Sequence, residues 1–196
     1  MWFKTLTGFH EESPDQVREN ISVNGEILKS HINGREFICG VLEIPSLAEL
    51  RESVLSSGIK TRKLSVREEI ADVQSLHIYE ENSGSLFQVA SQFHLLEMVS
   101  PDVTPEHGMS NYEYDRTQGP ACAVAAGAGT IYRNYFLDVN GRMGQAVNNQ
   151  IDCLADIGNA LGNSDNQLWV MRNGYAGTVN LSRLIVILIK NKPITF

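Results

Sequence analysis

Hydrophobic and polar residues alternate along residues 21–44, and two Asn-Gly pairs interrupt the alternation. A period of two is typical of strands with one buried face, and Asn-Gly between such strands is the strongest short signal for a hairpin. The pattern therefore predicts a β-meander of two hairpins, with turns at Asn24-Gly25 and Asn33-Gly34.

Two short helices are expected beside this meander. Ser13 followed by Pro14 predicts a helix that ends near Asn20, because serine caps helix N-termini and proline suits the first helical position. Ser46 predicts a second helix through about Ser56. Its hydrophobic residues recur at helical spacing on one face, at Leu47, Leu50 and Val54.

The second half of the chain alternates between strand and helix patterns. Apolar segments bounded by turn residues predict strands at 85–93, in LWVMRNGYA (168–176) and in the apolar run 184–189. A polar loop is expected at about 100–111. Helices are expected from Pro120 to about Tyr135 and from about Gln145 to Leu161, with Gly162 as the C-cap. Residues 66–79 fit either one amphipathic helix or a turn that leads into a strand.

This order of elements predicts an α/β (or α+β) fold with a mixed, partly parallel central sheet flanked by helices. We expect a β-rich N-terminal region with short helices at 1–60 and an α/β core at 61–196, which together form one compact domain of 196 residues.

The composition of the chain disfavours several classes of function. The formal net charge of −7 disfavours non-specific nucleic-acid binding. The densest basic group, between Lys60 and Arg67, is expected to be a solvated face. The longest apolar run has six residues, far short of a membrane span, and no signal peptide is expected. Cys39, Cys122 and Cys153 lack the spacing of a zinc or disulfide framework. We expect buried, reduced thiols in a cytoplasmic protein with no metal and no cofactor.

A charged tetrapeptide precedes the small-residue segment ACAVAAGAG (121–129). A helix that starts at Gly119-Pro120 would leave backbone N–H groups free to bind an anion, and glycine would allow the ligand close to the backbone. The side chains placed to help are Asp115, Arg116, Thr117 and Gln118. In the alternative interpretation, Asp115 or Thr117 only caps the helix and the small residues serve tight helix packing.

Polar residues also interrupt the apolar strand 85–93. Gln88, Ser91 and Gln92 lie toward its C-terminal end, where ligands bind in open α/β sheets, and Glu97 follows in the loop. Alternatively, Gln92 and His94 only satisfy buried backbone groups. Ser91 lacks the flanking glycines of a nucleophile elbow. Cys122, in the first turn of the expected helix, would need a nearby histidine to act as a nucleophile.

Three segments together resemble a family of mostly uncharacterised proteins that is macrodomain-like and akin to the ADP-ribosyl-hydrolases among bacterial effectors. These segments are DVQSLHIYEENSGSLFQVASQFHLLEMVSP, YEYDRTQGPACAVAAGAGTIYRNYF and LWVMRNGYA, within residues 71–176. The resemblance implies a macro-like α/β/α core that binds ADP-ribose in a cleft.

The resemblance also implies roles for single residues. Asp72 would hold the adenine, and Gln92, with Ser91 beside it, stands where a ribose-binding asparagine is found. Asp115 precedes the alanine-rich helix as the catalytic acid does in that family. The glycine-rich loop that normally follows the two leucines is replaced here by Glu97-Met98-Val99, and the expected C-terminal strand leaves room for little further structure.

The leading hypothesis is therefore a hydrolase that removes ADP-ribose from a protein side chain, with ADP-ribose or a related nucleotide, and an ADP-ribosylated protein, as partners. The candidate catalytic residues are Asp115 and Glu97. The candidate ligand-binding residues are Asp72, Ser91, Gln92, Arg116, Thr117, Gln118 and Gly119. Two alternatives stay open: a non-catalytic ADP-ribose-binding module, and an interaction protein without a small ligand.

Overall fold

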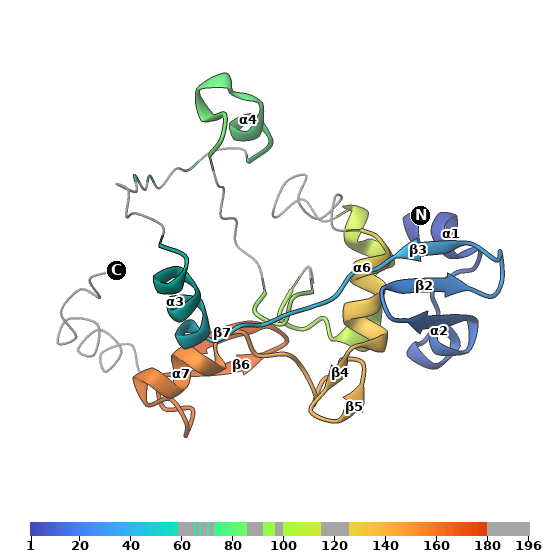
Figure 1. Ribbon diagram of the computed structural model, residues 1–196. Helices are drawn as coiled ribbons and strands as arrows, with labels where there is room; N and C mark the ends of the chain where they lie inside the picture. Colours follow the sequence, from blue (N-terminus) through green and yellow to red (C-terminus); the bar gives the residue numbers. More distant parts are fainter. Residues whose placement is uncertain are drawn as a thin grey trace.

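A three-stranded antiparallel meander and the helices beside it form the N-terminal part of the computed structural model (Figure 1). The structure describes residues 1–58, 65, 67, 70, 73–85, 92–96, 100–114 and 126–179. Helix α1 (Trp2–Thr7) and helix α2 (Pro14–Asn20) precede strands β1 (Ile21–Asn24), β2 (Ile27–Ser30) and β3 (Glu36–Ile38). The predicted meander and its first helix are confirmed, and the Ser13 hydroxyl accepts a hydrogen bond from Gln16 N at 3.2 Å.

The main hydrophobic core lies between this meander and residues more than sixty positions further along the chain. On β1 and β2 the side chains that point inward, Ile21 and Leu28, are buried, as the alternation requires. They share one cluster with the helix residues Phe3 and Val17 and with residues from 96 to 135. Those more distant members are Leu96, Met109, Tyr112, Ala128, Ile131 and Tyr135.

The middle of the chain is made of short helical segments. They are α4 (Val73–Ile78), the 3-10 turns η1 (Glu80–Asn82), η2 (Pro105–His107) and η3 (Ser110–Tyr114), and α6 (Ala128–Ile131), which continues as a π-helical turn, η4 (Tyr132–Phe136). The end of the predicted 120–135 helix is thus confirmed. Its start at Gly119-Pro120, like the predicted strand 184–189, lies outside the described residues.

The remaining described elements are two helices and two antiparallel hairpins. Helix α3 (Leu47–Ser56) follows an extended stretch after β3, and helix α7 (Ala155–Leu161) lies near it, where the Leu47 amide donates to Asp156 Oδ2 at 2.9 Å (Figure 1). Two hairpins complete the set, β4 (Asp138–Val139) with β5 (Arg142–Met143), and β6 (Trp169–Arg172) with β7 (Tyr175–Thr178). The predicted apolar stripe of α3 is not buried.

The mixture of helices and strands confirms the α/β or α+β class. The strands among the described residues pair only antiparallel, in three separate sheets, which is the α+β arrangement. The mixed, partly parallel central sheet of a macro-like core is therefore not found in this part of the chain. The expected strand at 85–93 is described only at its ends.

The helix expected from Gln145 to Leu161 begins ten residues later than expected, at Ala155. Residues 145–150 turn back on themselves instead, with backbone hydrogen bonds in both directions between Ala146 and Asn149. The Asn149 side chain donates to Val139 O at 2.9 Å, and Ile151 N donates to Gln145 Oε1 at 3.0 Å. Amide side chains that bond backbone groups in this way compete with helix formation.

Two residues expected to be buried thiols are only half-buried. Cys39 and Cys153 are free, and Cys122 lies outside the described residues. Burial raises the pKa of the Cys39 thiol. Among the residues that the structure describes, no helix is both long and apolar enough to cross a bilayer.

Candidate functional site

The candidate site is built on a tight turn at residues 92–96, the described part of the segment SLFQVASQFHLL. Leu95 has φ of 64°, a left-handed conformation that is rare and costly for a leucine. Two distant side chains hold this backbone: Gln145 Nε2 donates to His94 O at 3.0 Å, and Arg133 Nε donates to Leu95 O at 3.1 Å. Strain that is held from outside in this way is typical of functional sites.

The turn rests on the β6–β7 hairpin. Phe93 N donates to Gly174 O at 2.7 Å, and Gln92 Nε2 donates to the Tyr175 hydroxyl at 2.6 Å. The connection between the two strands is the pair Asn173-Gly174, with φ of 46° and 76°, as a type I′ turn requires. Segments far apart in the sequence, SLFQVASQFHLL and LWVMRNGYA, therefore meet at this point.

Gly174 fits directly beneath the turn. A Cβ at this position would lie 2.5 Å from Gln92 Cβ and 2.7 Å from His94 Cε1, and closer still to His94 Nδ1. Only glycine allows the imidazole to approach the hairpin backbone so closely. The position therefore combines a left-handed backbone with a contact that excludes any side chain.

His94 is fully buried in this turn. Its Nδ1 accepts a hydrogen bond from Leu96 N at 3.3 Å, so the proton of the neutral ring lies on Nε2. Nε2 is buried and has no hydrogen-bond partner among the residues that the structure describes. Burial lowers the pKa of His94 from 6.5 to about 4. His94 thus satisfies one buried backbone group, the N–H of Leu96, as the alternative interpretation expects for this residue.

This pKa predicts a pH dependence of stability. The unfolded chain binds a proton at His94 as the pH falls below 6.5, whereas the folded protein does so only near pH 4. Neutral His94 therefore stabilises the fold fully above pH 6.5. As the pH falls from 6.5 to about 4, the free energy of unfolding decreases by about 3 kcal/mol at most. We expect urea unfolding between pH 7 and 4 to show this slope in wild type and in His10→Gln, an exposed control. A His94→Gln protein with the same slope would contradict the assignment.

Cys153 lies beside the turn, where its backbone N–H donates to Phe93 O at 3.0 Å. Burial, and then the negative charge of Asp152, raise the pKa of its thiol. The thiol is therefore protonated at neutral pH and is a poor nucleophile. His107 bonds Thr104 through Nδ1, at 2.9 Å from both the backbone nitrogen and the hydroxyl.

Of the site residues expected from the sequence, Gln92 is the one that the structure describes. It is buried, with 4% of its surface exposed, and its amide donates to Tyr175. The other expected residues lie outside the described residues, namely Asp72, Ser91, Glu97, Asp115, Arg116, Thr117, Gln118 and Gly119. In the described part of the chain, no group of three or more His, Cys, Asp or Glu side chains could hold a metal ion.

Sequence reasoning missed three residues that build the turn: Arg133, Gln145 and Tyr175. Each was assigned only to a predicted helix or strand. The Asn173-Gly174 pair carried a usable signal, since Asn-Gly between two apolar segments is a hairpin turn. No local pattern marks Gln145, whose partner His94 is 51 residues away.

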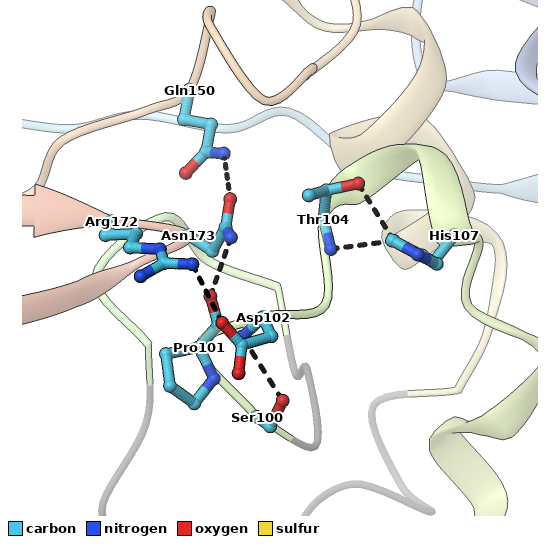
Figure 2. A network of polar contacts seen from close by, with 8 residues as sticks. All are labelled: Ser100, Pro101, Asp102, Thr104, His107, Gln150, Arg172 and Asn173. Atoms are coloured by element: carbon cyan, nitrogen blue, oxygen red, sulfur yellow. Dashed lines mark hydrogen bonds and ion pairs between the residues drawn. The ribbon is translucent and has the colours of Figure 1, made fainter.

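A polar hollow of about 420 Å³ borders the same hairpin, between residues 102–104, 147–152 and 171–173. Figure 2 shows the side chains that join its walls. Asn173 Nδ2 donates to Pro101 O at 2.7 Å, and Gln150 Nε2 donates to Asn173 Oδ1 at 2.9 Å. Arg172 pairs with Asp102 at 2.8 Å across the rim.

Comparison of the chain with protein-family models, with curated protein sequences and with solved structures finds no match.

Proposed function

We propose that the protein binds ADP-ribose and hydrolyses the bond that joins it to a protein side chain. The observation that carries the proposal is the strained turn at 92–96. Its Gln92 amide, expected near the distal ribose, is held by Tyr175, and the Leu95 carbonyl is held by Arg133. The turn thereby joins parts of all three sequence segments on which the macrodomain resemblance rests.

In this proposal the reaction is a glycosidic hydrolysis. Asp115 orients or deprotonates a water molecule, which adds to the anomeric carbon of the distal ribose while the bond to the protein side chain breaks. The leaving side chain takes up a proton. Gln92 and Glu97 hold the ribose, Asp72 holds the adenine, and Arg116 with the backbone near Gly119 binds the diphosphate.

A non-catalytic ADP-ribose-binding module is the second candidate. One observation favours it: at the described turn burial lowers the pKa of His94 to about 4 and raises the pKa of the Cys153 thiol, so His94 is a weak base and Cys153 supplies no thiolate at neutral pH. These groups are suited to hydrogen bonding and not to proton transfer at neutral pH.

Calorimetric titration with ADP-ribose tests the binding proposed for both candidates. We expect saturable binding, weakened about fivefold or more in Gln92→Ala because one ribose hydrogen bond is lost. Tyr175→Phe is the matched control, since it removes the hydroxyl that accepts from Gln92 and keeps the amide. If a folded wild-type protein gives no binding heat at millimolar ADP-ribose, both the hydrolase and the binding module are excluded.

Turnover separates the two candidates. With ADP-ribosylated protein as substrate, a hydrolase should release ADP-ribose and lose about 10²-fold or more of its rate in Asp115→Ala, the contribution typical of general acid–base catalysis. Equal and negligible turnover in wild type and variant, with binding retained, would identify the binding module.

A further inference from the structure

The polar hollow beside Asn173 is already built, with its walls fixed by the protein's own hydrogen bonds. Asn173 is almost completely buried, and both atoms of its amide are used, one by Pro101 and one by Gln150 (Figure 2). A third contact fixes the 147–152 wall, where Val147 N donates to Glu106 Oε1 at 2.8 Å. Because these contacts form without a ligand, binding in the hollow would require little ordering of the protein.

Polar groups that the fold does not use line the hollow. Within the described residues, the side-chain amide of Asn148 has no hydrogen-bond partner. Asp152 uses Oδ1 to accept from Leu154 N at 2.8 Å, and its Oδ2 has no partner in that part of the chain. The Gln150 amide nitrogen donates to Asn173 Oδ1 and to Val147 O, and its oxygen has no partner among the described residues. The hollow thus offers several acceptors, and the amide of Asn148 as a donor.

The charge of the lining selects against anions. Among the described residues of the lining, Asp102 and Asp152 are acidic, and the basic Arg172 is paired with Asp102. A phosphate or carboxylate would meet an excess of negative charge. The described residues of the lining also include no aromatic ring on which a base could stack.

Apolar surface completes the lining. Val147 has 61% of its surface exposed, and Met171 lies on the β6 side of the hollow. A sugar ring combines hydroxyl groups, which both donate and accept, with an apolar face of C–H bonds. Carboxylate and amide groups beside small aliphatic side chains match that combination. The volume lies within the ~300–1,000 Å³ typical of small-molecule sites.

We propose that this hollow is a binding site for a small, uncharged polyhydroxylated molecule of the monosaccharide class, separate from the proposed ADP-ribose site. The ring lies against Val147 and Met171. Its hydroxyls donate to Asp152 and Gln150 and accept from the Asn148 amide. Without an aromatic platform, the dissociation constant is on the order of 1 mM.

Saturation-transfer NMR on the full chain tests this, with glucose, galactose and ribose as probes. We expect transfer to at least one sugar, a dissociation constant raised about fivefold in Asn148→Ala by the loss of one hydrogen bond, and no transfer in Val147→Trp, which fills the hollow. Val170→Trp is the matched control and should bind normally, because Val170 is also an exposed valine, at 43%, and does not line the hollow.

Two results would overturn the proposal: no transfer to any of the three sugars at concentrations on the order of 10 mM, or transfer that survives in Val147→Trp. Near-ultraviolet circular dichroism confirms that each variant is folded. Excess ADP-ribose should leave the sugar signal unchanged. Displacement of the sugar would instead show that the hollow is part of a nucleotide site, and the separate sugar site would be rejected. Absence of ADP-ribose binding leaves the sugar result intact.

Discussion

Replacing Gly174 with alanine should be among the most destabilising single changes in this chain. The added Cβ would overlap His94 and Gln92 at the base of the 92–96 turn. The left-handed backbone, with φ of 76°, costs a non-glycine residue roughly 1–2 kcal/mol. Overpacking adds roughly 1–3 kcal/mol. We expect the free energy of unfolding, measured by urea denaturation, to fall by the sum of the two costs.

Gly141→Ala separates the two costs. Gly141 also follows an asparagine in a two-residue hairpin turn and also has φ of 76°, yet no atom of the described residues lies within 4 Å of its added Cβ. The free energy of unfolding of Gly141→Ala should therefore fall only by the backbone cost of roughly 1–2 kcal/mol. Equal destabilisation by the two substitutions would mean that the contact between Gly174 and His94 does not hold the turn against the hairpin.

Glu11→Ala should have an effect of similar size in the N-terminal part of the chain. One oxygen of Glu11 accepts from Met109 N at 2.8 Å and from the backbone and hydroxyl of Ser110, both at 2.6 Å. The other accepts from the Tyr135 hydroxyl at 2.6 Å. Alanine leaves these donors unpaired, some of them in the core. We expect the free energy of unfolding to fall by about 3–4 kcal/mol.

Glu12→Ala is the neighbouring control. Glu12 is exposed, and among the described residues only its backbone N–H bonds a side chain, Gln16 Oε1 at 3.0 Å. Its loss should change stability by less than about 0.5 kcal/mol. The stability of Glu11→Gln, which keeps an acceptor oxygen, should lie between those of Glu11→Ala and Glu12→Ala. Similar stability of Glu11→Ala and Glu12→Ala would show that the carboxylate does not join the N-terminal segment to the core.

The fold was predictable where the signals are local. The serine cap at Ser13 and the Asn-Gly turn at Asn24 depend on neighbours within a few residues, and both elements form as expected. Residues 145–154 were mispredicted because their apolar spacing imitates a helix. Their backbone is decided by the amides of Gln145 and Asn149, which bond carbonyls that the local pattern does not reveal.

The candidate site was predictable only in part for the same reason. Gln92 stands out because a polar residue interrupts an apolar strand. Tyr175 is 83 residues away from it and Glu11 is 124 residues from Tyr135, so no periodicity could have paired them. Residue type indicates that a group needs a partner, and tertiary packing decides which partner it finds.

The Asn-Gly turns also determine where the protein is most prone to deamidation. Asparagine before glycine is prone to deamidation, because the following backbone nitrogen can attack the side-chain carbonyl. At Asn173 that attack is hindered, since the buried amide is held by Pro101 and Gln150. Asn24 is exposed, and its side chain has no bond among the described residues. Deamidation should therefore occur first at Asn24, in the first hairpin, and much more slowly at Asn173, in the turn that supports His94.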